Sequence, residues 1–377
     1  MAYRLVNKIQ QFNFQINRVL TYGEMAGHET EIIQATKGIK TLDDWFDAWV
    51  CLGKKAECEG RWLHAAYSYR MAEFFLTGGR ADKQEMYDKS IELFYRGFDH
   101  LGISYEVRDI PYKGTKMHTV YLPAQKEKRI LLMCGGYDSF IEEFIVGVLD
   151  FLDAGYSLVF YEGDGQGKTL QEGLPFIHNW EEPTQCILDA YEITSCALIG
   201  ISWGGYLALR AAVFDKRITA VAAYDVLENG MDIMLNVFPS LLKRLVGGAI
   251  HQGRQRLVNK LVGFAMKKSL LAQWAFTQGM HITHTKTPFE FYCKLQLHTL
   301  EPIAEKITQD VLLLAGEKDH YIPKEQFEKA RAELINARSL KARMFTVEEG
   351  GEQHCQIGNH KLAIDEIVGW LEQIEDR

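Results

Sequence analysis

The chain has 377 residues and a formal net charge of −8; 47% of its residues are apolar and 24% are charged. This length exceeds that of most compact domains, so we expect two units, or one core with large insertions. The acidic balance, without a long basic run, argues against nucleic acid and against an anionic membrane as partners. No apolar stretch reaches the roughly 18 residues of a membrane-spanning helix, and Met1–Lys8 lack the apolar run of a signal peptide.

Seven cysteines are scattered along the chain, and no Cys-x-x-Cys pair occurs. The sequence therefore predicts neither a disulfide framework nor a zinc site, and no metal or cofactor is expected. A reducing cytoplasm is the predicted location.

Aromatic and apolar residues recur at helical spacing through the first part of the chain, as at Trp45, Trp49 and Leu52. We therefore predict an N-terminal helical domain over residues 1–102, with its aromatic side chains packed between helices. The aromatic content of these helices is also compatible with a homodimer.

From residue 103 the period changes to that of strands. Ile103–Ile110 and Met117–Leu122 alternate, which is typical of antiparallel strands. Short continuous apolar runs follow, each with a turn and a helical stretch behind it, and they indicate a mostly parallel, doubly wound α/β sheet. This core is predicted over residues 103–226 and 301–377. The runs are Ile130–Met133, Leu158–Tyr161, Ala197–Ile201, Ile218–Tyr224, Val311–Ala315 and Met344–Val347.

Residues 227–300 interrupt this alternation, because they show amphipathic helical patterns and no strand signal. An insertion after the carboxyl end of a parallel strand lies over the ligand crevice, so we predict a helical lid. The alternative is a helical excursion that packs elsewhere. Side chains of this insertion that could contact a substrate are Trp274, Met280, His281 and Phe289.

The motif Gly200-Ile201-Ser202-Trp203-Gly204 directly follows an apolar strand and precedes a helix of small residues. This context is typical of a nucleophile elbow, a strained turn that glycine neighbours permit and that lifts the serine hydroxyl above the sheet. Because a serine hydroxyl needs a base to become a good nucleophile, partners are expected later in the chain, first an acid and then a histidine.

Asp319 and His354 are the predicted partners of Ser202. Asp319 follows the strand Val311–Ala315 in a turn that ends in proline, and His354 lies in a glycine-rich loop between the last strand and the last helix. His320 is a rival base, but its adjacency to Asp319 makes it sterically awkward. His281 and His284 are predicted to be surface groups or substrate contacts rather than catalytic ones.

An oxyanion formed at Ser202 would need two backbone N–H groups. One is expected from Trp203 and the other from Tyr137, in the loop Cys134–Ser139 after the strand Ile130–Met133. Gly136 and Asp138 of this loop are predicted to approach the substrate, and Cys134 is interpreted as a small buried residue.

The loop Gly163–Thr169 ends in Gly-Lys-Thr and follows a strand, which suggests a nucleotide site. The phosphate-loop spacing, however, requires glycine where Glu162 stands, and a carboxylate there would repel phosphate. We interpret the loop as a tight turn beside the crevice.

Four stretches resemble the group of α/β-hydrolases that carry an N-terminal helical domain: Cys134–Ser139, Tyr161–Gly167, Ile201–Gly205 and Glu352–Asn359. This group includes dihydroxypseudooxynicotine hydrolase, the FrsA-like esterases and polyketide-shortening hydrolases of pigment biosynthesis. The helical region from Trp45 to Phe98 also looks similar, so the resemblance covers nearly the whole chain. The chain departs from the group at Asp164, where members often have proline.

The resemblance implies an α/β-hydrolase fold and, since several members cleave carbon–carbon bonds beside a ketone, that chemistry on a small molecule such as an aromatic polyketide or its carrier-bound form. A carboxylesterase or acyl-peptidase using Ser202, Asp319 and His354 is the alternative. A third reading is a partner-binding protein that has kept the fold without its chemistry, against which the intact motifs argue.

Overall fold

The computed structural model describes residues 2–78, 80–137 and 139–375. The chain forms two compact units. A helical unit comprises Met1–Tyr105, Glu142–Leu149 and Ile357–His360, and a sheet unit comprises Glu106–Ile141, Asp150–Gln356 and Lys361–Arg377. The boundary predicted at residue 102 stays a prediction.

The helices expected in the first part of the chain are present. An aromatic cluster fills the space between them: Phe12 stacks on Trp45 with ring centroids 5.1 Å apart, and the Trp45 indole N–H donates to the Met71 carbonyl at 2.6 Å. Aromatic burial therefore joins helices that are far apart in sequence. The elements are α1 (Gln10–Thr21), η1 (Gly23–Met25), α2 (Glu29–Thr36), α3 (Leu42–Cys58), α4 (Trp62–Phe74) and α5 (Ala81–Leu101).

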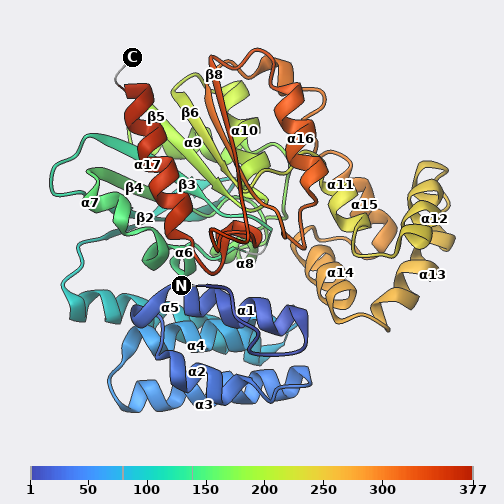
Figure 1. Cartoon of the computed structure of the whole chain (residues 1–377), viewed down its shortest axis with the longest axis horizontal. Coiled ribbons are helices and arrows are strands. Elements are labelled where there is room, and N and C mark those ends of the chain that lie inside the picture. The colour runs from blue at the N-terminus through green and yellow to red at the C-terminus, as the bar shows by residue number, and fades with distance from the viewer. Residues whose placement is uncertain (1, 79, 138, 376–377) are drawn as a thin grey trace. The chain divides into compact units, whose positions relative to one another are not determined.

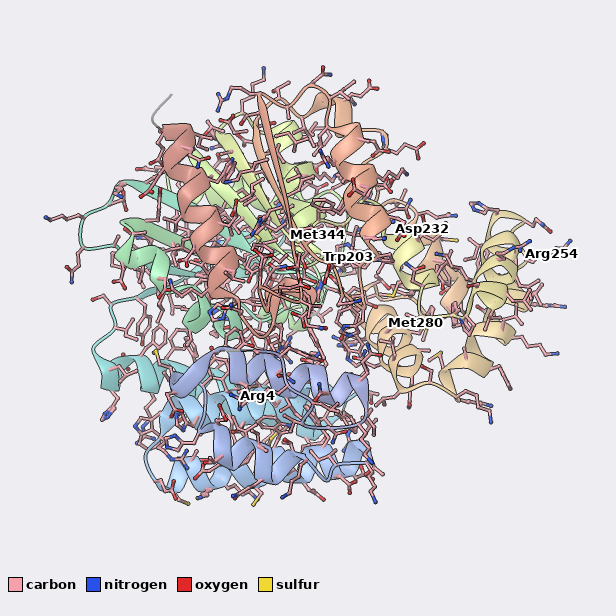
Figure 2. The ribbon with its side chains drawn as sticks, viewed as in Figure 1. Arg4, Trp203, Asp232, Arg254, Met280 and Met344 are labelled. Atoms are coloured by element: carbon pink, nitrogen blue, oxygen red, sulfur yellow. The ribbon has the colours of Figure 1, made fainter. Side chains whose placement is uncertain are left out.

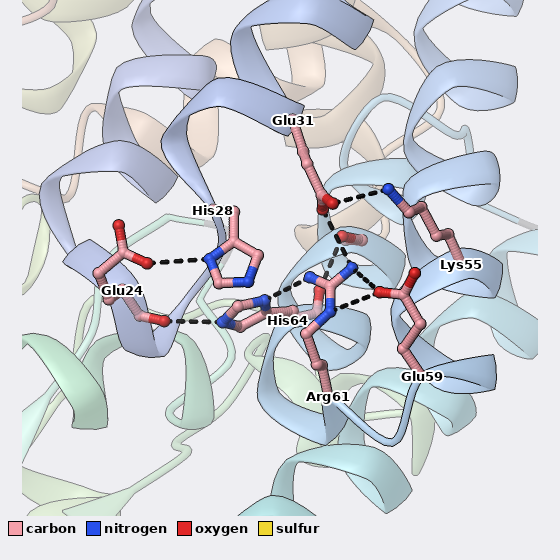
Figure 3. A network of polar contacts seen from close by, with 8 residues as sticks. Glu24, His28, Glu31, Lys55, Glu59, Arg61 and His64 are labelled. Carbon is pink, nitrogen blue, oxygen red and sulfur yellow. Dashed lines mark hydrogen bonds and ion pairs between the residues drawn. The ribbon is translucent and has the colours of Figure 1, made fainter.

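A polar network ties α2, α3 and α4 together at the surface of the helical unit (Figure 3). Arg61 contacts the carboxylate of Glu31 at 3.0 Å, and the same Glu31 pairs with Lys55 at 2.7 Å. The other end of the network reaches His64, whose ring lies 2.7 Å from Arg61. Because most of these side chains are partly exposed, the network adds little to stability.

A second set of ion pairs in the helical unit is buried. Arg70 on α4 contacts Glu73 and, at 2.5 Å, Glu143, while Lys83 on α5 also pairs with Glu73. Glu143 belongs to α6 (Glu142–Ile145), a segment that returns to this unit much later in the chain. These contacts fix the later segment on the N-terminal helices.

The sheet unit is built on eight strands in the order β1-β2-β4-β3-β5-β6-β7-β8. The pairs β1–β2 and β2–β4 are antiparallel and all the others are parallel, so the expected mostly parallel sheet is confirmed. The strands β3 to β7 are buried because helices cover both faces. The strands are β1 (Glu106–Tyr112), β2 (Thr115–Leu122), β3 (Arg129–Cys134), β4 (Tyr156–Tyr161), β5 (Cys196–Ile201), β6 (Ile218–Tyr224), β7 (Asp310–Gly316) and β8 (Ser339–Phe345).

The last strand differs from the sequence prediction. An apolar run placed it at Met344–Val347, whereas β8 begins at Ser339 and ends at Phe345. It is an edge strand that pairs only with β7, and six of its seven residues are half-buried. Such a strand has no continuous apolar run, so the pattern used for the buried strands misplaced it.

Helices cover the sheet on both faces (Figure 1). On one face α9 and α10 pack against each other, and on the other α17 packs against α7. The connecting elements are α6, η2 (Val146–Val148), α7 (Asp150–Asp153), α8 (Gly167–Gln171), α9 (Glu181–Ala190), α10 (Gly204–Phe214), η3 (Ala304–Lys306), α16 (Lys324–Glu333), η4 (His354–Gln356) and α17 (Lys361–Glu375).

Between β6 and β7 the described residues form five α-helices, followed by the short 3-10 helix η3, and no named strand. An isolated antiparallel bridge between Asn229 and Thr299 closes the base of this insertion. Within the described part of the chain, no helix is both long and apolar enough to cross a membrane. The five helices are α11 (Gly230–Leu235), α12 (Ser240–His251), α13 (Gln255–Met266), α14 (Leu270–Ile282) and α15 (Pro288–Leu295).

Candidate active site

The strand order reverses at one point in the sheet, where β3 lies beside β5. Cys134 at the end of β3 is in register with Gly200 near the end of β5. The loops that leave these two strands diverge, and in open α/β sheets ligands bind at such switch points, outside the carboxyl ends of the strands. The loops after β3 and β5 are those that contain Tyr137 and Ser202.

Ser202 occupies the turn from β5 to α10 with a φ of +62°, a left-handed conformation that is rare for residues other than glycine. Its N–H donates to the Tyr224 carbonyl at 2.6 Å, and its carbonyl accepts from Gly205 at 2.9 Å. A Cβ at Gly200 would lie 1.9 Å from the Gly204 carbonyl oxygen, so only glycine permits this approach of helix to strand. The turn has the geometry expected of a nucleophile elbow.

The structure brings Ser202, His354 and Asp319 together. His354 Nε2 lies 2.8 Å from Ser202 Oγ, and His354 Nδ1 lies 2.6 Å from Asp319 Oδ2. The other oxygen of Asp319 accepts the N–H groups of Tyr321 and Ile322 at 2.7 and 2.9 Å. Because Oδ1 is held in this turn, Oδ2 is left facing the imidazole. Ser202 is half-buried, whereas the side chains of His354 and Asp319 are buried.

The protonation of this pair is set by burial and by mutual attraction. Burial alone would lower the pKa of His354, but the Asp319 carboxylate outweighs it and holds that pKa well above its ordinary value. Burial would likewise raise the pKa of Asp319, yet the imidazole keeps the pKa of this carboxyl below its usual range. Asp319 is therefore ionised, and the imidazolium form of His354 is stabilised.

Asp225, directly after β6, is a second carboxylate near His354 and was not found by sequence reasoning. Its Oδ2 lies 3.6 Å from His354 Nδ1 and accepts the Cys355 N–H at 2.8 Å, while Oδ1 accepts from the Gln356 amide at 2.9 Å. Burial raises its pKa to about 7. A polar residue at the end of a buried strand beside the elbow was the available signal.

The loop after β3 lies against the elbow. A Cβ at Gly136 would be 2.8 Å from the Trp203 backbone nitrogen, so the backbones of the two predicted oxyanion segments are in close approach. The rings of Tyr137 and Trp203 pack at 5.4 Å, and the Tyr137 hydroxyl donates to the Ala275 carbonyl of α14 at 2.6 Å. Tyr137 therefore links the elbow to the insertion.

Gln166 fixes the orientation of this loop, although the sequence suggested only a tight turn at that position. The side chain is fully buried, and its amide nitrogen donates to the carbonyls of Gly135 and Gly136 at 2.8 Å each. The Gly136 carbonyl and the Tyr137 N–H belong to one planar trans peptide and point in opposite directions. Holding the carbonyl on Gln166 therefore directs the Tyr137 N–H away from Gln166.

His298 is a third polar residue that sequence reasoning missed. The Trp203 indole N–H donates to His298 Nδ1 at 3.1 Å, and the imidazole stacks on Phe176 with centroids 5.1 Å apart. Burial lowers the pKa of His298 well below its ordinary value, so the ring is neutral and can accept this hydrogen bond. This hydrogen bond fixes the indole of Trp203, the residue that follows Ser202 in the chain.

The side chains predicted to contact the substrate lie in different surroundings. The ring centroid of Trp274 lies 6.3 Å from that of Tyr137 and 6.5 Å from that of Tyr321. The ring centroid of Tyr321 in turn lies 5.2 Å from that of His354. Met280 and Phe289 pack against the apolar core, and His281 lies in the last turn of α14. Asp138 lies outside the described residues. The substrate roles of these side chains and of Gly136 stay predictions.

Other candidate groups are unsuited to catalysis. Burial lowers the pKa of the rival base His320 to about 4 and raises that of the Cys134 thiol to about 12. In the glycine-rich loop, Lys168 pairs with Asp109 at 2.9 Å, and Glu162 accepts the Lys168 N–H at 2.7 Å. The lysine and the helix N-terminus that a phosphate would need are thus engaged by carboxylates.

One cluster of the described residues has metal-ligand types within reach of one another: Asp225, His354 and Cys355, whose ligand atoms lie within 4.8 Å. Both oxygens of Asp225 accept hydrogen bonds from the loop after His354. His354 Nδ1 and Nε2 face Asp319 and Ser202. The donor set is therefore used within the protein.

Comparisons with known proteins identify relatives of this chain. Among curated proteins, hydrolase acrC of Aspergillus aculeatus is 27% identical and 20-hydroxy-prefusarin hydrolase FUS2 of Gibberella moniliformis 26% identical, each alignment covering 96% of both chains. The structure of 2,6-dihydroxy-pseudo-oxynicotine hydrolase matches with a TM-score of 0.70 over 94% of both chains at 16% identity. The family model described as alpha/beta hydrolase fold matches residues 133–354. This match spans more than half of the residues, and the chain therefore belongs to the α/β-hydrolase fold family.

Proposed function

We propose that the protein is a serine hydrolase that cleaves a carbon–carbon bond beside a ketone through an acyl-enzyme. Ser202 is the nucleophile, His354 the general base and Asp319 the group that orients and stabilises it. The proposal rests on one continuous chain of contacts, from Ser202 Oγ through both nitrogens of His354 to Asp319 Oδ2. This is the arrangement that acyl transfer by a serine requires.

In the first half-reaction, Ser202 Oγ attacks the ketone carbon while its proton passes to His354 Nε2. The backbone N–H groups of Trp203 and Tyr137 stabilise the oxyanion. When the oxyanion collapses, the carbon–carbon bond breaks, and its electron pair leaves as an enolate. The enolate takes the proton from His354 Nε2, so that a neutral ketone departs and the acyl group remains on Ser202.

In the second half-reaction, water attacks the acyl-enzyme while His354 Nε2 accepts its proton. Collapse of the second oxyanion releases the carboxylic acid, and the proton returns to Ser202 Oγ. A leaving enolate needs no more than one proton donor, so His354 suffices for both halves. Stabilisation of the imidazolium by Asp319 lowers the barrier of each attack.

The substrate is proposed to be a small molecule with a 1,3-dicarbonyl or aryl-ketone group. Trp274 on α14 is a half-buried aromatic ring whose centroid lies 6.5 Å from that of Tyr321, and the Tyr321 ring in turn lies 5.2 Å from His354, centroid to centroid. An aromatic ligand could stack there while the helices exclude water. The names of the relatives, among them 20-hydroxy-prefusarin hydrolase, support a small-molecule hydrolase.

The decisive experiment measures turnover of a synthetic aryl β-diketone and of a p-nitrophenyl ester by the wild type and by Ser202→Ala. We expect diketone cleavage that falls by about four to six orders of magnitude in the variant. Ser104→Ala, at an exposed serine, is the matched control and should retain full activity.

Two results would redirect or end the proposal. Rapid ester turnover with an inert diketone would identify the alternative, a carboxylesterase or acyl-peptidase that uses the same three residues. Equal rates for the wild type and Ser202→Ala, together with no labelling of Ser202 by a fluorophosphonate, would exclude serine catalysis altogether.

A further inference from the structure

Formal charge is distributed unevenly along the chain. Residues 233–289 contain eight lysines and arginines and no aspartate or glutamate. Since the net charge of the whole chain is −8, the remaining residues together carry −16. The insertion between β6 and β7 is therefore a cationic part of an otherwise acidic protein, and its potential attracts anions.

Four of these charges lie on α12 and α13, which pack against each other as a helical hairpin, and three more lie directly beside the ends of α13 (Figure 1). We call residues 240–268 the basic hairpin; they hold seven of the eight basic side chains. Arg254 lies at the turn between the helices, at the outer end of the hairpin and away from Trp203 (Figure 2). Among the residues that the structure describes, none of the seven forms an ion pair, in contrast to buried pairs such as Arg70 with Glu143.

The basic hairpin also exposes large apolar side chains. Four of the eleven exposed large hydrophobic residues in the described part of the chain lie on these two helices. A cluster of this kind in so short a segment marks an interaction surface, whereas single exposed apolar residues are ordinary. The exposed fractions are 70% for Leu241, 53% for Leu245, 39% for Leu257 and 63% for Phe264.

The apolar and basic side chains share the same helical faces. On α13 and its C-terminal cap, Leu257, Lys260, Phe264 and Lys267 follow at intervals of three or four residues, and all four are exposed. On α12, exposed Leu241, Arg244 and Leu245 share one face in the same way, while Val246 and Ile250 are buried on the other. Each helix therefore presents a solvent-facing stripe that is both apolar and cationic.

This combination matches the chemistry of a lipid surface better than that of a protein. Protein–protein interfaces are depleted in lysine relative to the rest of a protein surface, whereas four of the seven basic residues here are lysines. A membrane surface needs one sign of charge toward the headgroups and apolar side chains that enter the acyl boundary, which are the features of interfacial helices. The basic hairpin has both and no acidic residue.

We propose that the basic hairpin binds peripherally to a lipid surface that carries anionic headgroups, with Leu257 and Phe264 entering the interface beside Lys260 and Lys267. The net charge of −8 argued against an anionic membrane as a partner, and this proposal reverses that expectation. The net charge of the whole chain conceals the local excess of positive charge in residues 233–289. The inference does not depend on the chemistry proposed for Ser202.

The test is sedimentation of the full chain with vesicles. We expect the protein to bind vesicles of phosphatidylcholine mixed with phosphatidylglycerol, about tenfold or more strongly than vesicles of phosphatidylcholine alone. Added salt should release it, since exposed charges are screened. Replacing Lys260 and Lys267 together by glutamine should weaken binding by a factor of about ten to thirty.

Matched variants separate this surface from general stickiness. Phe264→Ser should also weaken binding, whereas Ile335→Ser, at an exposed apolar residue of the sheet unit, should not. Glutamine at the exposed lysines Lys216 and Lys324 controls for total charge. Circular dichroism checks that each variant is folded.

Three outcomes would overturn the proposal. The first is no binding to either kind of vesicle, and the second is vesicle binding that the hairpin variants leave unchanged. The third is binding to a soluble acidic polypeptide such as polyglutamate without binding to vesicles, which would assign the surface to an acidic protein instead.

Discussion

The proposed mechanism gives His354 two chemical tasks that pull its pKa in opposite directions. As a base it must be neutral before each attack, yet the Asp319 carboxylate stabilises its charged form and raises its pKa well above the ordinary value, despite burial. In the free protein the carboxylate therefore favours the imidazolium form. The same stabilisation lowers the energy of the imidazolium that forms in the transition state.

This leads to a prediction for the pH dependence of kcat/KM. The neutral fraction of His354 grows as the pH rises toward its raised pKa, so kcat/KM should increase with pH above neutrality. In Asp319→Asn the negative charge that raises the pKa of His354 is lost. The rise of kcat/KM should therefore occur at lower pH. The limiting rate should fall by about four orders of magnitude, as when other triads lose their acid.

The profile can be followed by ester turnover or, for the weak variant, by the rate of fluorophosphonate labelling at Ser202. Asp232→Asn on α11 is the control and should leave the profile unchanged. A profile of Asp319→Asn that keeps the wild-type midpoint would show that Asp319 does not set the pKa of His354.

At the scale of residues, the sequence predicted the groups whose position follows from a local pattern. Ser202, Asp319 and His354 each follow a strand and lie in a glycine-containing turn, which made them recognisable. Gln166 and Asp225 were missed because their importance lies in hydrogen bonds to residues distant in sequence. A side chain that orients another group leaves no pattern of its own in one sequence.

At the scale of elements, the proposed oxyanion site depends on two loops that meet at the end of the sheet. Gln166, in the loop after β4, holds the carbonyls of Gly135 and Gly136 in the loop after β3. Without these two hydrogen bonds the peptide between Gly136 and Tyr137 is free to rotate. The Gln166 side chain then no longer fixes the direction of the Tyr137 N–H. Gln166 thus acts as a positioning residue for the proposed oxyanion site.

We therefore expect Gln166→Ala to lower kcat by a factor of about 100 to 1000, the usual cost of losing one oxyanion donor, with little change in KM. Binding of a trifluoromethyl ketone, which forms an oxyanion on Ser202, should weaken in parallel. The pH midpoint that reports His354 should stay where it is. Gln252→Ala, at the exposed glutamine that caps the C-terminus of α12, should match the wild type.

The outcome that would refute this role is a higher KM with unchanged kcat, because it would mean that Gln166 contributes to ground-state binding rather than to the oxyanion. A variant with lowered kcat and full affinity for the ketone inhibitor would also contradict it. Circular dichroism separates these cases from loss of the fold.

The elements themselves were largely predictable, for a physical reason. Strands buried on both faces, such as β5, require continuous apolar runs, and amphipathic helices require a period near 3.6, so both leave strong patterns. The edge strand β8 needs neither, and its start at Ser339 was missed. The site was thus predictable where burial imposed a pattern.

At the scale of the whole molecule, the chain returns to its helical unit long after leaving it. Glu143 on α6 contacts Arg70 on α4, and Tyr95 on α5 donates to Glu142 at 2.7 Å. The sequence suggested a boundary at residue 102 because composition and period change there. Such long-range ion pairs could not be foreseen, because no local pattern records which charge will meet which.

The buried ion pairs of the helical unit provide the last prediction. The side chain of Arg70 is 4% exposed and contacts Glu73 and Glu143, whose side chains are 2% and 4% exposed. Arg70→Met keeps much of the volume but leaves Glu143 with Arg18 alone, at 3.2 Å, and Glu73 with Lys83 alone. A buried charge left without any partner costs about 3–5 kcal/mol. Because each carboxylate keeps a second cation, we expect the free energy of unfolding to fall by at most about that amount.

The measurement is urea denaturation followed by fluorescence and circular dichroism. The matched control is Arg80→Met, because Arg80 is half-exposed and pairs with Asp82 at the surface, where an ion pair contributes at most about 1 kcal/mol. If both variants shift the midpoint equally, the Arg70 contacts do not stabilise the unit. A large shift for Arg70→Met alone would show that the return of α6 to the N-terminal helices depends on a buried charge, since Arg70 bridges carboxylates from both segments.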